Sequence, residues 1–324
     1  MKRLVAGILA IVLVLIAVVI GRTLMLPPPP VVDASALPAP ISNDAAMRAA
    51  ANLSAAIKMP TISWQRGATG DKAEASQKAL VDFRDFISAT YPAFTAATTR
   101  KIVSDYSLLF TWRGSDESLK PVLLMSHMDV VPVVAGTEGN WTHAPFAGEI
   151  ADGSVWGRGA IDCKGSLIAM LEAAETLSAQ SFQPKRTIMF AFGHDEEVSG
   201  LNGNLKIAQM LEARGVKLAF VSDEGGMVTQ GVVGGVTGPV AIIGIAEKGY
   251  MTLQLTAHAK GGHSSMPPAQ NETAVGRLIK AMTHVGAAPF KSGMDVPTRA
   301  MLDALAPAMP FTRRMVFANM WLFE

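Results

Sequence analysis

Three segments decide the fold: PVLLMSHMD at residues 121–129, RTIMFAFGHDEE at residues 186–197 and LAFVSDEGG at residues 218–226. Each is a short apolar run that ends in polar residues, a pattern typical of a buried strand. Between these runs, residues 166–179 and 205–213 carry apolar side chains at helical spacing. The alternation predicts an α/β fold with a largely parallel sheet and helices on both faces.

Upstream of the first run, the sequence predicts two more helices. Residues 71–89 have apolar side chains at helical spacing, and Asn43 or Asp44 is a candidate N-cap for a helix that begins near Ala45. We therefore expect the α/β domain to begin at this helix.

Downstream of Gly249 the pattern changes. Residues 251–257 alternate between apolar and polar or small residues, as in a half-buried strand, and residues 273–285 form an amphipathic helical pattern. We expect a first domain at residues 45–248 and a second, smaller α+β domain at residues 249–324.

The N-terminus has the pattern of a membrane segment. Residues 4–20 are apolar apart from one Gly, Lys2 and Arg3 precede them, and prolines crowd the stretch that follows. A helix of this length covers about 26 Å of a bilayer core of about 30 Å. We interpret residues 1–26 as a membrane anchor or signal segment and residues 27–44 as a stiff, Pro-rich linker.

An uncleaved anchor with the globular part outside the cytoplasm is the favoured interpretation, because the positive charges precede the apolar run. A cleaved signal peptide, which would make the protein secreted, and a buried core helix are the alternatives.

The composition excludes some classes of protein. The 324 residues carry a net charge of +1, which gives no electrostatic reason to expect nucleic acid as a partner. The single cysteine, Cys163, excludes an internal disulfide.

Polar side chains that could bind a metal follow each of the three predicted strands. The carboxyl ends of parallel strands lie at one edge of a sheet, so His127, the Glu196–Glu197 pair and the Asp223–Glu224 pair should converge there. The glycine-rich loop GRGAIDCKG at residues 157–165 adds another carboxylate. Taken alone, each motif has a structural explanation. Converging carboxylates, however, need a counter-charge, and histidine with carboxylates suits zinc.

The segments LLMSHMDVVP, GRGAIDCKG, FGHDEEVSG, DEGG and GGHSSMPP resemble the zinc-dependent family of carboxypeptidase S, aminoacylase, carboxypeptidase G and succinyl-diaminopimelate desuccinylase. The sequence is most similar to the carboxypeptidase S and N-acyl-amino-acid amidohydrolase branch. The resemblance runs from about residue 45 to residue 324. It implies a zinc exopeptidase-like catalytic domain with an inserted α+β lid and dimerisation domain, and therefore a possible homodimer.

The resemblance also implies two Zn²⁺ ions and their ligands. His127 would bind one zinc, Asp162 would bridge both ions, and Glu197 would bind the other. The last ligand of the His127 zinc would be Asp223 or Glu224, and the sequence leaves that choice open.

The same resemblance implies three catalytic residues. Asp129 would orient the His127 imidazole, Glu196 would be the general base, and His263 would reach the oxyanion. The function implied is hydrolysis, by a zinc-activated water, of the amide bond of small peptides or N-acyl amino acids with a free carboxylate. We interpret Arg158 and Lys164 as structural or charge-balancing residues.

The family pattern also needs a further histidine, from a segment that returns to the first domain after the second. Only His258, His263 and His284 follow Glu224, and none has that context. We therefore expect a fragment in which both domains are incomplete and one zinc site lacks a ligand. The alternatives to an active metallopeptidase are an inactive fragment or non-catalytic binding protein of the same fold and, with less support, a nucleotide-binding domain.

Overall fold

The computed structural model describes residues 2–29, 40–64, 69–263, 265–266, 268–288, 290 and 293–323. The chain forms two compact units. We call Leu37–Glu224 the sheet unit, and Met1–Ala36 together with Gly225–Glu324 the flanking unit. Residues 30–39 of the predicted linker lie outside the described residues. The domain boundaries expected from the sequence stay predictions.

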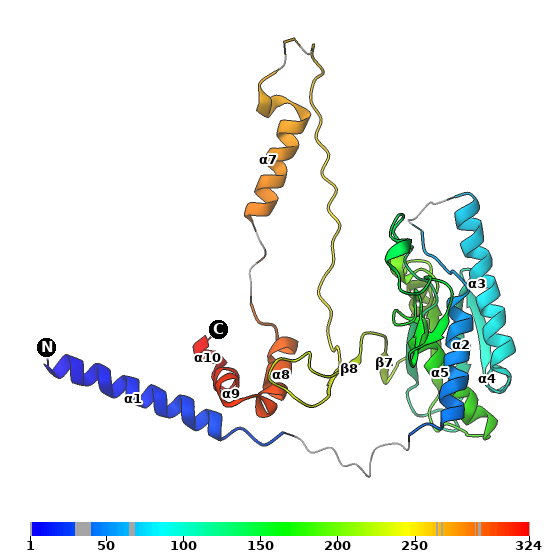
Figure 1. Ribbon diagram of the computed structural model, residues 1–324, viewed down its shortest axis with the longest axis horizontal. Coiled ribbons are helices and arrows are strands. Elements are labelled where there is room, and N and C mark those ends of the chain that lie inside the picture. The colour runs from blue at the N-terminus through cyan, green and yellow to red at the C-terminus, as the bar shows by residue number, and fades with distance from the viewer. Residues whose placement is uncertain are drawn as a thin grey trace. The chain divides into compact units, whose positions relative to one another are not determined.

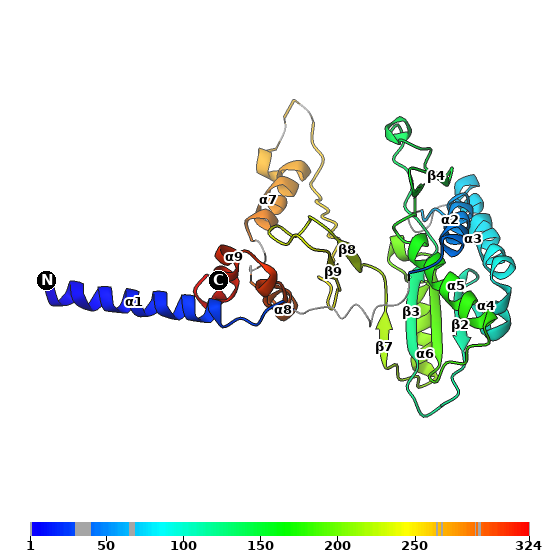
Figure 2. The ribbon, with the colours of Figure 1, turned by 60° about the horizontal axis from the view of Figure 1, so that its bottom comes forward.

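A five-stranded mixed sheet organises the sheet unit (Figure 2). Its strands, in spatial order, are β1 (Thr99–Val103), β2 (Ser107–Trp112), β6 (Ile188–Gly193), β3 (Val122–His127) and β7 (Phe220–Ser222).

The three strands predicted from the sequence are the parallel part of this sheet. Strand β3 pairs in parallel with β6 on one side and with β7 on the other. Strands β1 and β2, which the sequence did not predict, extend the sheet in antiparallel pairing. Strand β7 was expected to be buried, but all three of its residues are exposed because it forms the edge of the sheet.

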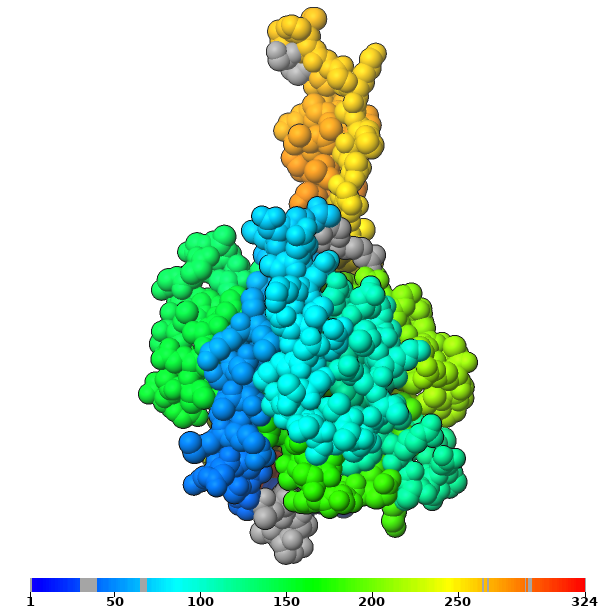
Figure 3. Space-filling model, turned by 90° about the vertical axis from the view of Figure 1, so that its right-hand side faces the viewer, coloured from blue at the N-terminus to red at the C-terminus, as the bar shows by residue number. Residues whose placement is uncertain are grey.

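Helices cover both faces of the sheet, which confirms the predicted fold class. The helices of the sheet unit are α2 (Asn43–Ile57), α3 (Asp71–Thr90), α4 (Pro92–Ala97), α5 (Lys164–Ala179) and α6 (Asn204–Ala213). Buried side chains of α2 to α5 pack against one face, and α6 packs against the other. Figure 3 shows the outer surface that α2 and α3 form on the first of these faces.

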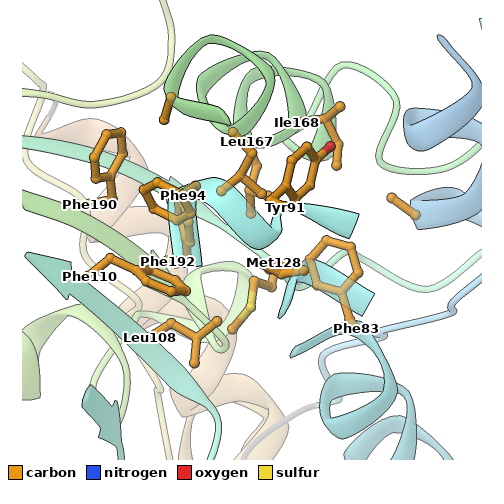
Figure 4. Packing of buried hydrophobic residues seen from close by; sticks show 14 of the residues in the cluster. Phe83, Tyr91, Phe94, Leu108, Phe110, Met128, Leu167, Ile168, Phe190 and Phe192 are labelled. Atoms are coloured by element: carbon orange, nitrogen blue, oxygen red, sulfur yellow. The ribbon is translucent and has the colours of Figure 1, made fainter. Parts of the chain in front are cut away.

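The larger core lies between the sheet and α2 to α5, and aromatic rings fill much of it (Figure 4). The Phe94 ring lies 4.8 Å from the Phe110 ring and 5.2 Å from the Phe190 ring, and none of the three side chains is more than 3% exposed. Burying one such side chain stabilises a fold by about 1.5–3 kcal/mol. This core therefore fixes the strand ends that carry the polar motifs.

The helix termini show where local sequence reasoning was right and where it was wrong. Helix α2 is capped by Ser42, whose hydroxyl accepts a hydrogen bond from the Ala45 amide at 3.3 Å. Neither Asn43 nor Asp44 is the N-cap, because both already lie in the helix. Helix α6 ends just before Gly215, which has a φ of 69° as expected of a glycine at a helix C-terminus.

A small hairpin projects from the sheet unit between β3 and α5. It consists of β4 (Glu149–Ala151) and β5 (Ser154–Trp156), and the short 3₁₀ helix η2 (Glu138–Asn140) precedes it. The glycine-rich loop follows β5 directly, so the hairpin and the loop form one continuous surface segment.

The flanking unit contains further helices (Figure 1) and one short two-stranded sheet, in which β8 pairs with β9 (Figure 2). Its helices and strands are α1 (Lys2–Leu24), β8 (Met227–Thr229), β9 (Val240–Ile242), α7 (Ala274–Ala287), α8 (Val296–Leu305), α9 (Phe311–Phe317) and α10 (Met320–Phe323). Helix α7 confirms the predicted helix at residues 273–285.

The prediction of a strand at residues 251–257 is wrong. Residues 243–263 form neither helix nor strand. Tyr250 and Met251 are 91% and 68% exposed. Alternating sequence makes a strand only where another strand pairs with its backbone, and no described residue does so here.

Helix α1 confirms that the N-terminal apolar run is helical. Its 23 residues are long and apolar enough to cross a membrane, a property that an N-terminal signal sequence shares.

Candidate metal centre

His127 occupies the last position of β3, at the edge of the sheet where the parallel strands end. Its side chain is 1% exposed, and its Nδ1 lies 2.9 Å from the backbone carbonyl oxygen of Asp129. An Nδ1–H that donates to this carbonyl leaves the Nε2 lone pair free to bind a cation. Nε2 faces two carboxylate oxygens, Oδ1 of Asp162 at 2.9 Å and Oε2 of Glu224 at 3.2 Å.

Asp162 reaches this position because the glycine-rich loop is tied to α2. The Lys164 ammonium is buried and donates hydrogen bonds to the backbone carbonyls of Ala56, at 2.9 Å, and Met59, at 2.7 Å. Burial lowers the pKa of Lys164 to about 7. Gly159 has a φ of 85°, and a Cβ there would lie 2.6 Å from a Val130 methyl, so the loop needs glycine at this position.

The Asp129 carboxylate organises the loop that carries the two glutamates. It is fully buried, and it accepts hydrogen bonds from the Glu196 and Glu197 amides at 3.1 Å each and from the Ser63 hydroxyl at 2.6 Å. Burial alone raises the pKa of Asp129, but hydrogen bonds from His127 and Ser63 outweigh it and hold the pKa below its usual range. Asp129 therefore positions the acidic loop as well as lying beside the His127 ring.

The two residues of the Asp223–Glu224 doublet are placed differently. Glu224 points toward His127, while the Asp223 carboxylate accepts a hydrogen bond from the Glu224 amide at 2.9 Å. The geometry thus brings Glu224, and not Asp223, to the cluster.

Two groups of side chains bring potential ligand atoms within 4.8 Å of one another: His127 with Asp162 and Glu197, and His127 with Cys163 and Glu224. The sequence did not place Cys163 among the ligands. Its thiol is buried and lies 2.6 Å from the Ser126 hydroxyl. Buried cysteines commonly serve as small packing residues.

The charges of the cluster repel one another. Burial and then the charge of Asp162 raise the pKa of Glu197 to about 7. Burial also raises the pKa of Glu196, an effect that His127 opposes and Glu224 increases. Burial lowers the pKa of His127, but hydrogen bonds to Asp129 and Cys163 outweigh it and raise the pKa to about 12. A divalent cation among these carboxylates would supply the compensating charge, so the residues fit a metal.

Three other polar residues, Glu196, His194 and His263, are in different surroundings. Glu196 lies slightly farther out, with its Oε2 3.8 Å from His127 Nε2. His194, which precedes the acidic loop, is held by the Ser107 hydroxyl at 2.6 Å from its Nδ1, and burial lowers its pKa. His263 belongs to the flanking unit and is exposed, with its Nδ1 2.7 Å from the Ser265 hydroxyl; Ser264 lies outside the described residues.

Sequence reasoning missed Ser63 and the anchoring role of Lys164. Ser63 lies far from the motifs in sequence, and the sequence gives no signal for its contact with Asp129. For Lys164 the sequence did contain a signal. A lysine in a glycine-rich loop that opens a helix needs a partner if it is buried.

The matching family model is that of peptidase family M20/M25/M40, over residues 123–309. This match covers more than half of the chain, and the chain belongs to this family. The family of zinc-dependent enzymes that the motifs resemble is thereby confirmed.

Curated relatives agree with this assignment. The N-fatty-acyl-amino acid synthase/hydrolase PM20D1 of Mus musculus is 38% identical over 294 residues, which are 90% of this chain and 56% of that protein. The probable carboxypeptidase S-like 2 of Dictyostelium discoideum is 38% identical over 277 residues, 85% of this chain and 52% of that protein. The chain spans about half the length of the curated relatives it matches.

Among solved structures, human carnosine dipeptidase 1 aligns with a TM-score of 0.44 and 19% sequence identity, over 58% of this chain and 42% of that chain.

Proposed function

We propose that the protein is a zinc-dependent amidohydrolase that cleaves small peptides or N-acyl amino acids bearing a free carboxylate. The observation that carries the proposal is the convergence of Asp162, Glu197 and Glu224 on His127, with ligand atoms within 4.8 Å in each group. The names of the relatives support the substrate class, since one is a fatty-acyl-amino acid synthase/hydrolase and the other a probable carboxypeptidase.

The proposed ligands are His127 and Glu224 for one zinc, Glu197 for the other, and Asp162 between the two. A carboxylate with two oxygens can bridge two cations and reduce their mutual repulsion. Glu224 is preferred to Asp223 because its oxygen lies 3.2 Å from His127 Nε2. When bound, zinc lowers the pKa of water toward about 7 and polarises the amide carbonyl.

Glu196 is the proposed general base. Its backbone amide is fixed by Asp129, and its carboxylate lies near the cluster but farther from His127 Nε2 than Asp162 does, at 3.8 Å against 2.9 Å. It would take a proton from the attacking water and deliver one to the leaving amine. A raised pKa, caused first by burial, suits a carboxylate that must hold that proton between the two steps.

Residues outside the sheet unit complete the proposal. His263 would donate a hydrogen bond to the oxyanion. Helix α1 would anchor the protein to a membrane with the globular part outside the cytoplasm, or serve as a cleaved signal. Residues 249–324 would act as a lid and as a surface for homodimerisation.

The test uses the full chain, purified without metal and then loaded with zinc. We expect the zinc-loaded chain to hydrolyse an N-acyl amino acid, and the amount of free amine that is released measures this activity. Asp162→Ala should lose bound zinc, measured by elemental analysis, because both ions share this ligand.

Glu196→Gln is the matched variant, since it should keep zinc and lose activity by about 10²- to 10⁴-fold. If the wild-type chain binds zinc, Asp162→Ala loses it, and the wild-type chain hydrolyses no peptide or N-acyl amino acid, the result would instead support a non-catalytic binding role. Retention of zinc by Asp162→Ala would contradict the proposed centre.

A further inference from the structure

Residues 311–323, which include helices α9 and α10, combine exposed apolar side chains with basic ones. Arg313 and Arg314 are the only charged residues of this segment, and residues 304–323 contain no acidic residue. A basic segment with outward aromatic and apolar side chains is typical of helices that lie in the plane of a membrane surface. Four of its large apolar side chains are between 42% and 53% exposed: Phe311, Trp321, Leu322 and Phe323.

The segment packs against the last turns of helix α1, which belongs to the same unit. Asn319 is fully buried, and its side-chain amide donates to the Val19 carbonyl at 3.1 Å and to the Thr23 hydroxyl at 3.3 Å. From the other side, Nε of Arg22 donates to the Ala318 carbonyl at 3.1 Å. Val19 and Thr23 are the buried residues of α1, so the contact covers one end of that helix and leaves the rest of its apolar surface exposed.

The polar groups at this contact are turned inward. The Trp321 indole N–H donates to Oδ1 of Asn319 at 3.4 Å, and the Asn319 amide also donates to the Met315 carbonyl at 2.8 Å. A surface that meets lipid has to satisfy its polar groups inside the protein, because the hydrocarbon offers no hydrogen bonds. The inward polar groups and the outward rings therefore suit a lipid surface.

The contact with α1 also sets the depth of the segment. The 23 residues of α1 measure about 35 Å, against a bilayer core of about 30 Å. With Lys2 and Arg3 on the cytoplasmic side, Val19 and Thr23 lie near the outer boundary of the core. A segment packed on these two residues lies where tryptophan rings and snorkelling arginines are favoured.

We propose that residues 311–323 dock on the outer surface of a phospholipid bilayer. The exposed apolar side chains would enter the boundary between headgroups and acyl chains, and the exposed Arg22 and Arg313 would lie near the phosphates of anionic lipids. The proposal rests on the proposed anchoring role of α1 and is independent of the metal chemistry. The anchor then has two parts, one that spans the bilayer and one that lies in its interface.

The test uses the full chain reconstituted into vesicles of phosphatidylcholine and phosphatidylglycerol. Leu322→Cys carries an NBD fluorophore, and the vesicles contain a lipid with a nitroxide near its headgroup. The native Cys163 is 1% exposed, and wild-type chain treated with the same reagent gives its background. The nitroxide should quench the label at position 322 about two- to fivefold, because an interfacial side chain lies at the depth of the quencher.

The matched control is Tyr250→Cys with the same label. Tyr250 belongs to the same unit, is 91% exposed and lies in a stretch that is neither helix nor strand. Its label should stay in water, where soluble iodide quenches it and the nitroxide lipid does not.

A second measurement needs no label. Trp321 is the one tryptophan of the segment, and the other four, at positions 64, 112, 141 and 156, lie in the sheet unit. Trp321→Phe should therefore remove more than about half of the tryptophan quenching by brominated lipid. Trp112→Phe, at a side chain that is 4% exposed, should leave that quenching unchanged.

The proposal is overturned if the chain floats with the vesicles and the nitroxide quenches the label at position 322 no more than the label at position 250. In that case α1 alone is the anchor. It is also overturned if the label at position 322 is shielded from iodide but not quenched by lipid, since protein would then cover the segment.

Flotation and hydrolysis in the same samples distinguish the possible failures. A chain that does not float with vesicles contradicts both the anchoring role of α1 and the docking of residues 311–323. A chain that hydrolyses nothing but shows lipid quenching at position 322 contradicts the amidohydrolase proposal and supports the docking.

Discussion

Helices α5, in the sheet unit, and α7, in the flanking unit, are both predicted from apolar spacing, and both form. Helix α5 buries Leu167 and Leu171 completely, against the sheet. On α7, Ile279 and Met282 are 54% and 59% exposed, and no residue of the helix is buried. Periodicity is therefore enough to make a helix, whereas stability requires a packed surface opposite it.

The largest expected effect comes from a matched pair of isoleucine-to-alanine substitutions on two helices. Ile87 on α3 is fully buried, so Ile87→Ala should lower the free energy of unfolding of the sheet unit by about 2–5 kcal/mol. Ile279→Ala on α7 should change it by less than about 0.5 kcal/mol, because that side chain is already exposed. Urea unfolding followed by tryptophan fluorescence measures both values. Equal losses would show that α7 is packed in solution.

The second prediction asks whether the flanking unit contributes to the chemistry. Under the proposed function, His263→Ala should lower kcat by about 10²- to 10³-fold, as removal of one oxyanion donor does in other enzymes. His258→Ala is the control, since that exposed histidine contributes only its backbone carbonyl, to Arg277. Steady-state hydrolysis by both variants gives the comparison. Full activity of His263→Ala would confine the chemistry to the sheet unit.

The third prediction compares two tyrosines at alkaline pH. Tyr91 is buried and donates to Glu172 at 3.2 Å; burial and then the charge of Glu172 raise its pKa. Because the folded-state pKa lies above the unfolded value of about 10, the unfolded chain loses this proton first. The contribution of Tyr91 is therefore complete below about pH 10 and is lost as the pH rises above it.

Tyr91→Phe should cost about 1.5 kcal/mol at neutral pH through the lost hydrogen bond to a charged group, and it should flatten the alkaline decline. Tyr250→Phe, at a side chain that is 91% exposed, is the control and should leave the decline as it is. Urea midpoints between pH 8 and 11 test both variants. If Tyr91→Phe loses stability at alkaline pH as the wild type does, the loss arises from other titrating groups.

The smallest expected effect concerns two N-caps. Ser42 caps α2 and Thr273 caps α7, each through its side-chain oxygen. Ser42→Ala should lower the stability of the sheet unit by about 1 kcal/mol, because α2 packs into its core. Thr273→Ala should leave that stability unchanged and reduce only helicity, measured by circular dichroism. An equal loss of stability in both variants would show that α7 unfolds cooperatively with the sheet unit.

The parallel part of the sheet was predictable, since β3, β6 and β7 are apolar runs with polar ends. The antiparallel strands β1 and β2 were not predicted. The strand expected at residues 251–257 failed because sheet pairing depends on a partner that a local pattern does not specify. The positions of Asn43 and Asp44 show the same limit at a helix end, where the residue that caps α2 is the neighbouring Ser42.

For the candidate site, the side chains able to bind a metal were visible in the sequence, and the strand order predicted their convergence. The distances between these side chains could not be deduced from the sequence. Glu224 and Asp223 are adjacent and chemically alike, and only the fold turns Glu224 toward His127. The buried contacts of Asp129 with Ser63 and of Lys164 with the Ala56 and Met59 carbonyls join residues far apart in the chain, so the local sequence does not identify these partners.

By itself the sequence determined the parallel strands, several helices, the family and a set of candidate metal ligands, because these depend on residue type and spacing along the chain. The tertiary structure decided which carboxylates face His127 and which helices pack against a core. Those features depend on how distant segments pack together, and short-range pattern carries no information about that packing.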